Sequence, residues 1–600
     1  MQKIAAWGVL VLVVGQWLWM SWLRWPDPIR DFGRELYVPW QLNQGRMLYQ
    51  DLFYLYGPFS VYFNALVFRL LGTSITALVA VNFLLLAGLS GLIFSLFRFL
   101  AGFWAAYSAL LIFLGIFAFG QYTDVGNYNY ICPYAHGVVH GLILSFLALI
   151  VLKQWLLRPS VLGLIILGLL WGLVFLTKFE VFLALTSALA VTMLLHGWMT
   201  KELGTSVRRM GLIVLIFGLF FWIFPKPLTA GKLLEIIFNR YAHSMLSPAS
   251  TGYYGNLSGF NTLWANVTLV LESALGYMLA VFALVFVSGL VSRVKDKLSR
   301  QVIVGVLAGL IVIAGFFLTS DALWLLFRPL PLILVIMMLV TLRALFRKSL
   351  TRHEAVKNLL LLSIIIFSFV LLFKIFLNVH VYHYGFALAM PGALLLAGGF
   401  VYYIPLLGRG KWYAPSVCRL LGLALLMAGI IGHFKWANYY YSRKDHAVGR
   451  GYDTMLAWNP HVFSTPSMMS FAIDWIQKNT RSTDTVVTIP EGAMINFLSR
   501  RKNPMQDIEF MPNMKEEKII ESFQKVQPNF VVVVFRDMSE YGAAFFGKDY
   551  GTKVDQWIQD HYSMIFYMQA PTKAGLEFVT ILMRGKRPSS SFKETEVILR

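Results

Sequence analysis

Charged residues are scarce in this sequence. Only 14% of the 600 residues are charged, whereas 58% are hydrophobic. A soluble globular protein of this length carries about 25% charged residues, so this composition excludes that class. Cysteine is also scarce: Cys132 and Cys418 lie far apart, and no disulfide framework is expected. The first apolar run, Ile4 to Leu23, lacks a small-residue cleavage site after it, which indicates a retained span.

Long apolar runs dominate the first three-quarters of the chain. A segment of about 20 apolar residues is long enough to cross a bilayer. A shorter apolar stretch at residues 58–72 contains Arg69, and we expect it to be a helix that lies in or re-enters the membrane interface. The remaining windows predict about 13 transmembrane helices, at residues 4–23, 75–97, 101–119, 136–157, 160–176, 180–198, 211–224, 263–291, 302–319, 323–342, 358–377, 384–407 and 416–434.

The distribution of basic residues orients these spans. The formal net charge is +21. With the N-terminus inside, the inner loops hold 19 Lys and Arg residues but only three acidic ones, Glu202, Asp296 and Glu354. Inner loops of membrane proteins are enriched in Lys and Arg in this way. We therefore expect the N-terminus on the cytoplasmic side and, after an odd number of spans, the C-terminus outside.

The composition changes after Phe434. Helical spacing recurs at residues 467–479, 515–526 and 554–562, and strand-like runs occur at 485–489, 529–535 and 577–583. Alternating helices and strands are typical of a small α/β domain. The final residues from Pro588 are expected to form a loose tail. The sequence thus predicts an all-α polytopic membrane domain at 1–435 and a soluble outer-face (periplasmic) α/β domain at 436–600.

The first outer loop, residues 24–72, is unusually rich in charged and aromatic residues. It contains the stretch Asp31-Phe32-Gly33-Arg34-Glu35 directly after the first span. One interpretation is a solvated Asp–Arg pair that contributes little energy. The other is a site, because carboxylates held close to a bilayer edge are costly unless they are paired or used.

The motifs of this loop resemble those of a known superfamily. They are Asp-x-x-Arg-Glu, Gly-x-x-Leu-Tyr-x-Asp, Tyr-Gly-Pro and an apolar helix that ends in Leu-Gly. This order resembles the first outer loop of the C-type integral-membrane glycosyltransferases, in particular bacterial aminoarabinose, mannosyl and lipopolysaccharide-core transferases. The aminoarabinose enzymes have Lys-Pro-Pro where this chain has Tyr56-Gly57-Pro58.

The resemblance implies both a function and a cellular location. Members take a sugar from a polyprenyl-phosphate carrier and pass it to an acceptor, which here would be an envelope glycan, a lipid or a protein. It implies an inverting transferase in a bacterial inner membrane, with Asp31 at the position of the acidic catalytic residue. An acceptor hydroxyl needs a base as it attacks the anomeric carbon, which is the role expected of Asp31.

Two further acidic residues are candidates for the catalytic set. Glu35 either takes part directly or pairs with Arg34 or Arg30 to shape the loop. Asp124, in the second outer loop, is either a second acid or a residue that orients the acceptor. His136 and His140 follow it at helical spacing and would suit a metal ion. Histidines packed against tyrosines are the commoner arrangement, so we predict no metal site, and a divalent cation as cofactor is left open.

The leaving phosphate of such a donor needs cations nearby. The outer-side candidates are Lys178, Arg240, Lys374 and His383. Three of them have an alternative: Lys178 pairs with Glu180, Arg240 belongs to a flexible loop, and His383 is an aromatic-belt anchor. The resembling families often have Thr-Lys at the position of Lys178.

A transporter or flippase of lipid-linked sugars is the alternative function. Transporters of this kind often carry inverted repeats and ionisable residues at mid-span depth. The sequence shows no inverted repeat and places its charged residues at the outer rim. A structural membrane protein with a partner-binding outer domain is a third hypothesis. Nothing in the sequence points to nucleic acid.

Overall fold

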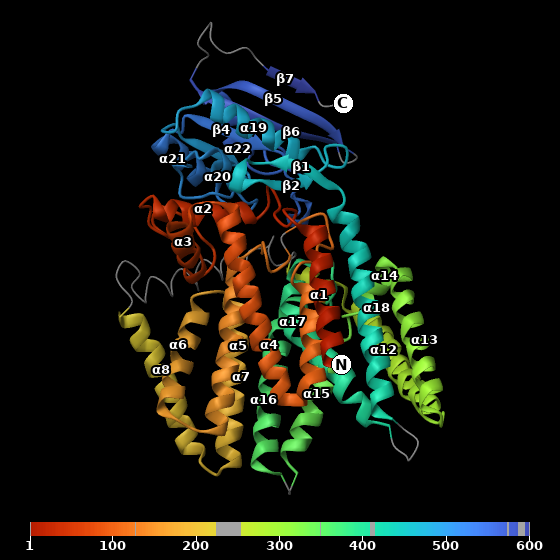
Figure 1. The fold of residues 1–600 in the computed structure, drawn as a ribbon. Coiled ribbons are helices and arrows are strands. Elements are labelled where there is room, and N and C mark those ends of the chain that lie inside the picture. Colours follow the sequence, from red (N-terminus) through yellow and green to blue (C-terminus); the bar gives the residue numbers. More distant parts are fainter. Residues whose placement is uncertain are drawn as a thin grey trace.

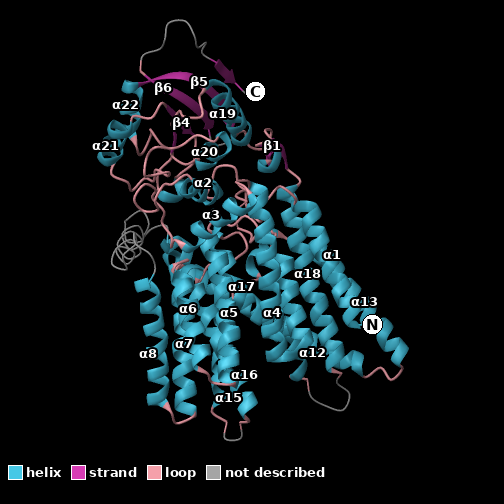
Figure 2. Cartoon of the chain, turned by 60° about the vertical axis from the view of Figure 1, so that its left-hand side comes forward, coloured by secondary structure: helices cyan, strands magenta, loops and turns pink. Residues whose placement is uncertain are grey.

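The structure is a computed structural model that describes residues 2–126, 128–223, 254–347, 350–408, 414–572, 575–585 and 595–598. Long helices stand side by side in one layer, and an α/β domain built from the last part of the chain covers one end of that layer (Figures 1 and 2). Two short helices, α2 (Phe32–Asn43) and α3 (Phe59–Leu71), lie between the layer and the domain. The first outer loop is therefore enclosed between the two parts of the molecule.

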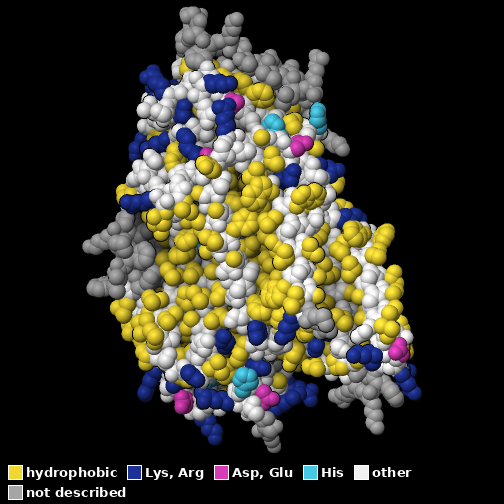
Figure 3. All heavy atoms as spheres, viewed as in Figure 1, with side chains coloured by type: hydrophobic (Ala, Val, Ile, Leu, Met, Phe, Trp, Pro, Cys, Tyr) yellow, Lys and Arg dark blue, Asp and Glu magenta, His cyan; other side chains and the backbone are white. Residues whose placement is uncertain are grey.

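The helical layer is apolar throughout its length. Within the described ranges, ten helices are long and apolar enough to cross a membrane. Hydrophobic side chains cover its flanks, and lysines and arginines gather at the end away from the α/β domain (Figure 3). The chain is a multi-pass membrane protein. The helices of this layer are α1 (Gln2–Ser21), α4 (Ile75–Ile112), α5 (His136–Leu157), α6 (Val161–Phe175), α7 (Phe179–Met199), α8 (Leu203–Ile223), α12 (Leu263–Ser292), α13 (Lys297–Ala314), α14 (Ser320–Leu325), α15 (Leu330–Leu345), α16 (Arg352–Leu371), α17 (Met390–Tyr402) and α18 (Pro415–Tyr441).

The α4 segment folds back on itself. Gly102 has φ +81, a conformation that a side chain would disfavour, and the helical geometry breaks there. The rings of Phe94 and Phe103 lie 6.1 Å apart, and so do those of Phe83 and Phe119. These pairs can meet only if the two halves run antiparallel. The segment thus supplies the two predicted spans 75–97 and 101–119, while the predicted total of about 13 spans stays a prediction.

The helix expected at residues 58–72 is present as α3. One face, with Val61 and Phe68, is buried, whereas Leu66 and Leu70 on the other face are exposed. This apolar exposed face agrees with a helix in the membrane interface, and that placement remains a prediction.

The outer domain contains a five-stranded sheet in the order β3-β4-β6-β5-β7. β3 and β4 are parallel, as are β5 and β7, and the other pairs are antiparallel. A separate hairpin of β1 and β2 joins the domain to α18. The strands are β1 (Lys444–Val448), β2 (Met455–Trp458), β3 (Val486–Ile489), β4 (Phe530–Val534), β5 (Tyr562–Thr572), β6 (Gly575–Arg584) and β7 (Thr595–Ile598), and the helices are α19 (Thr465–Asn479), α20 (Ala493–Ser499), α21 (Glu516–Val526) and α22 (Thr552–His561).

Alternating residues of the strands face two different cores. Val487 and Val531 pack with α21 and α22, whereas Val486 and Val532 pack on the side of α19. Successive side chains of a strand point to opposite faces, so near-continuous apolar runs fill both faces of the sheet.

Four details differ from the sequence-based prediction. α18 extends to Tyr441, past the predicted boundary at residue 435, because its last turns stay helical beyond the apolar run. Tyr562 begins strand β5 instead of ending a helix. Part of the expected loose tail pairs with β5 as β7. The β1–β2 hairpin was not predicted, since its strands are short.

Candidate active site

Asp31 occupies a strained backbone position at the start of α2. It has φ +55 and ψ −58 and precedes the first helical residue. Non-glycine residues in such conformations cost about 1–3 kcal/mol and cluster at functional sites. Its side chain is 32% exposed, and Oδ1 lies 3.2 Å from Arg34 Nη2. The carboxylate is therefore both held in place and accessible.

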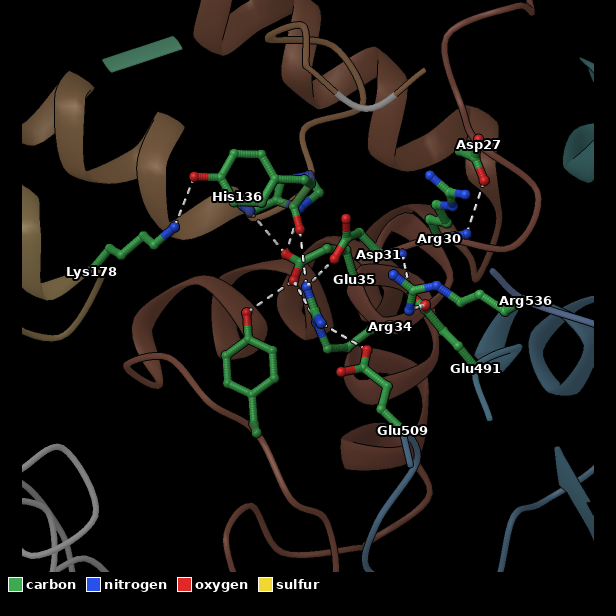
Figure 4. A network of polar contacts seen from close by, with 12 residues as sticks. Asp27, Arg30, Asp31, Arg34, Glu35, His136, Lys178, Glu491, Glu509 and Arg536 are labelled. Atoms are coloured by element: carbon green, nitrogen blue, oxygen red, sulfur yellow. Dashed lines mark hydrogen bonds and ion pairs between the residues drawn. The ribbon is translucent and has the colours of Figure 1, made fainter. Parts of the chain in front are cut away.

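Arg34 is the centre of a buried charge cluster (Figure 4). Its Nη1 donates to Glu509 Oε1 at 2.7 Å, its Nε lies 3.6 Å from Glu35 Oε1, and its Nη2 contacts Asp31. Burial alone would lower the pKa of Arg34, but the surrounding carboxylates, with Glu509 first, raise it well above its ordinary value. One fixed positive charge thus balances carboxylates from both parts of the molecule.

Glu35 is fully enclosed and hydrogen-bonded on both oxygens. Tyr54 Oη donates to Oε1 at 3.1 Å, and the backbone amide of His136 donates to Oε2 at 2.9 Å. His136 Nδ1 also lies 2.9 Å from Oε2. Burial would raise the pKa of Glu35, but the contacts with His136 and the charge of Arg34 hold it below its usual range. These contacts indicate that Glu35 shapes the loop.

The two histidines of α5 have separate partners. His136 bridges Glu35 and Asn82, whose Nδ2 lies 3.1 Å from His136 Nε2. His140 Nδ1 contacts Ser60 Oγ at 3.0 Å. In the described part of the chain, no group of three or more His, Cys, Asp or Glu side chains is placed to hold a metal ion. The carboxylates around Arg34 pair with cations and hydroxyls of the protein.

Two lysines lie beside the loop, the buried Lys178 and the partly buried Lys374. Lys178 directly precedes α7, is 2% exposed and donates to Tyr134 Oη at 2.8 Å. Its Nζ lies 3.3 Å from Glu180 Oε1, and Lys374 Nζ lies 3.4 Å from the same oxygen. Among the described residues, two ammonium groups thus share the Glu180 carboxylate, which leaves an excess of positive charge there. Such a cluster suits a phosphate.

Tyr56 connects the two clusters. The Arg34 guanidinium lies 5.4 Å from its ring centroid, and Lys178 Nζ lies 4.7 Å from it. The next residue, Gly57, donates to the Thr177 carbonyl at 2.9 Å, and a side chain at Gly57 would clash with Leu176. The Tyr-Gly-Pro motif therefore fastens the first outer loop to the turn that carries Lys178.

The outer domain contributes residues that the sequence analysis did not identify. Glu491 accepts a hydrogen bond from the Asp31 amide at 2.8 Å, and Arg536 donates to Glu491. Glu509 pairs with Arg34. Glu491 follows the buried strand β3, and Arg536 follows the buried strand β4. Polar residues in this position, directly after buried strands, are the sequence pattern that could have identified them.

The other predicted residues lie at different distances from this centre. Asp124 is exposed, and its carbonyl accepts a hydrogen bond from Trp458 Nε1 at 3.0 Å. Its carboxylate is one of the charges that raise the pKa of Arg30, the residue before Asp31. His383 lies close to the lysine cluster, because both His383 and Lys374 contact the Tyr384 ring. Burial, together with the charge of Lys374, lowers the pKa of His383 to about 3, so it is neutral at pH 7. Arg240 lies outside the described residues.

The fold, unlike the sequence, matches known proteins. No protein-family model and no curated protein matches the sequence. The oligosaccharyltransferase of Archaeoglobus fulgidus, in a crystal structure with Zn and sulfate, is similar in structure, with 13% identity, a TM-score of 0.50, and coverage of 95% of this chain and 72% of the archaeal one. The same archaeal protein tethered to an acceptor peptide has 13% identity and a TM-score of 0.49, with 98% and 75% covered.

A third similar structure is ArnT from Cupriavidus metallidurans bound to undecaprenyl phosphate. It has 12% identity and a TM-score of 0.39, with 97% of this chain and 98% of that chain covered. The archaeal enzyme carries the C-type glycosyltransferase fold, and the expected resemblance is therefore confirmed at the level of the fold.

Proposed function

We propose that this chain, which has a fold of the C-type glycosyltransferases, moves a sugar from a polyprenyl-phosphate donor to an envelope glycan, lipid or protein acceptor. The observation that carries the proposal is the position of Tyr56. The Arg34 guanidinium, which contacts the accessible Asp31, lies 5.4 Å from the centre of its ring, and the Lys178 ammonium of the lysine cluster lies 4.7 Å from it. A base and a phosphate-binding cluster thus face the same small region.

The donor phosphate is assigned to Lys178 and Lys374. Lys178 is buried and Lys374 is largely buried, with 12% of its side chain exposed, and a phosphate that contacts their ammonium groups would compensate the charge that Glu180 leaves unbalanced. Cations placed where negative charge develops stabilise the transition state. As the bond between the anomeric carbon and the phosphate oxygen breaks, the leaving polyprenyl phosphate takes the bonding electrons and is held there.

The acceptor is assigned to the side of Asp31. Its carboxylate accepts the proton of the acceptor hydroxyl while the oxygen attacks the anomeric carbon from the face opposite the phosphate, which inverts that centre. Arg34 contacts Asp31 through one nitrogen and keeps its carboxylate oriented. Glu35, 3.6 Å from Arg34 Nε, supports Arg34, and Asp124 is assigned a role with the acceptor at the rim. The proposal places the protein in a bacterial inner membrane, with its N-terminus in the cytoplasm and residues 436–600 on the outer face.

Mass spectrometry of cells tests this function. Envelope glycans and carrier lipids are compared between cells with the protein, cells without it, and cells that carry only Asp31→Asn. The expected result is that one sugar disappears from the envelope in both deficient strains, while its polyprenyl-phosphate form accumulates. Envelope profiles that are identical in all three strains would contradict the proposal.

A further inference from the structure

The backbone of Asp31 is held by the outer domain. Strained residues persist only where the surrounding structure determines their conformation. The Asp31 amide donates to Glu491 Oε1 at 2.8 Å, and Glu491 lies 460 residues later in the chain. Glu491 hydrogen-bonds the main chain of Asp31, so this hydrogen bond acts on the carboxylate through the conformation of that residue.

Glu491 is itself fixed by a second residue. Its side chain is only 5% exposed, and its Oε2 accepts a hydrogen bond from Arg536 Nη1. A buried carboxylate is costly unless it is paired and hydrogen-bonded. Arg536 supplies the charge on one oxygen, which leaves the other oxygen aimed at the Asp31 amide (Figure 4).

The sheet fixes both residues. β3 ends at Ile489 and β4 at Val534, and the two strands are parallel with Ile489 opposite Val533. Glu491 and Arg536 follow these ends directly, so they meet at one edge of the sheet. Side chains at the ends of strands are positioned more precisely than side chains within long loops.

A close backbone contact supports the same docking. Gly33, in the first turn of α2, packs against Met494 at the start of α20, and a side chain at Gly33 would clash with the Met494 backbone. Met494 follows Glu491 by one short turn. The glycine in the Asp31 motif therefore allows the approach that brings Glu491 to Asp31.

We propose that Glu491, oriented by Arg536, is a positioning residue for the transfer reaction. It sets the backbone of Asp31 and thereby the direction of the base, so that the outer domain completes the active site. This inference rests on the proposed function and adds to it a role for the outer domain in the chemical step.

A double-mutant cycle on the purified full-length protein tests this role. The variants are Glu491→Ala, Asp31→Asn and the combination of both, assayed for sugar transfer from a polyprenyl-phosphate donor. A misplacement of about 1 Å can cost about 100-fold in rate. We expect kcat of Glu491→Ala to fall on that scale with an unchanged donor KM, and Glu491→Gln, which keeps an acceptor oxygen, to recover part of it.

The cycle separates positioning from a merely structural role. If Glu491 acts through Asp31, then Glu491→Ala causes no further loss in the Asp31→Asn background. Glu540→Gln is the matched control, because Glu540 also pairs with Arg536 but has an exposed side chain and no hydrogen bond to Asp31. It should retain wild-type kcat. If Glu491→Ala does not fold, Glu491→Asp, which keeps the charge but shortens the reach, takes its place in the cycle.

Two results would overturn the inference while leaving the proposed function intact. One is a normal kcat for the Glu491 variant in an assay in which Asp31→Asn is inactive. The other is an additional loss in the double variant as large as in the wild-type background. Normal transfer by Asp31→Asn would instead overturn the proposed function itself.

Discussion

The two ends of the helical layer differ in how far their charged side chains are exposed. At the end away from the outer domain, Arg293, Lys295 and Arg343 are exposed to solvent. At the other end, Arg34 and Lys178 are buried and meet carboxylates and aromatic rings. Exposed basic residues suit the orientation of spans and cost little. Buried charges are costly unless they are paired, and their concentration at one end agrees with the site proposed there.

The largest effect on sugar transfer is expected for the Asp31 carboxylate, at the end of the layer that faces the outer domain. Asp31→Asn keeps the size of the side chain but cannot accept the proton of the acceptor. General-base catalysis contributes about 100- to 10,000-fold, and transfer should fall on that scale. The measurement is the rate of sugar transfer by the purified variant. A larger loss in Asp124→Asn or Glu35→Gln would move the base to that residue.

The lysine cluster is expected to act on donor binding. Lys178→Ala or Lys374→Ala removes one charge-assisted contact to the donor phosphate, which contributes about 1.5–3 kcal/mol. The donor KM should rise accordingly in each variant. Lys435→Ala is the control, because Lys435 is exposed and contacts the carbonyl of Phe316. An unchanged donor KM in both cluster variants would place the phosphate elsewhere.

Glu35 is expected to matter for stability and for its pH dependence. Glu35→Gln leaves part of a buried network unsatisfied, which costs about 1–3 kcal/mol of folding free energy. Because the folded-state pKa of Glu35 is lowered, its stabilising contribution is present above its ordinary pKa of about 4.3 and is lost as the pH falls through the folded value.

Thermal unfolding at two pH values measures this effect. The Tm of the wild type should exceed that of Glu35→Gln at pH 7, and the difference should shrink in acid below the ordinary glutamate pKa. A difference in Tm that does not change with pH would show that the charge of Glu35 has no part in the stabilisation.

The smallest effect is expected at the opposite end of the layer. Arg293→Gln removes an exposed charge, and substitutions of this kind usually change stability by less than about 0.5 kcal/mol. Transfer and donor KM should equal those of the wild type. A loss of transfer comparable to that of Lys178→Ala would break the distinction between the two ends.

The periodicity of apolar residues in the sequence predicted much of the fold, but it did not predict much of the candidate site. Apolar windows predicted the long helices, and the strand-like runs at 485–489 and 529–535 became β3 and β4. The pairing of Lys374 with Glu180 and of Arg34 with Glu509 joins distant parts of the chain, and no local pattern in one sequence encodes it. The strand β7 escaped prediction because its partner strand, not its own composition, orders it.

The most direct test of the central claim is the fate of the donor in detergent micelles. A micelle has no two sides, so moving a lipid-linked sugar across a membrane leaves no product there, whereas transfer releases free polyprenyl phosphate. Purified wild-type protein, supplied with a polyprenyl-phosphate sugar and an envelope extract as acceptor, is followed by mass spectrometry of the lipid. The account predicts release of free polyprenyl phosphate that matches the sugar gained by the acceptor and is lost in Asp31→Asn. A donor that stays intact while the protein binds it would contradict the account and favour a transporter.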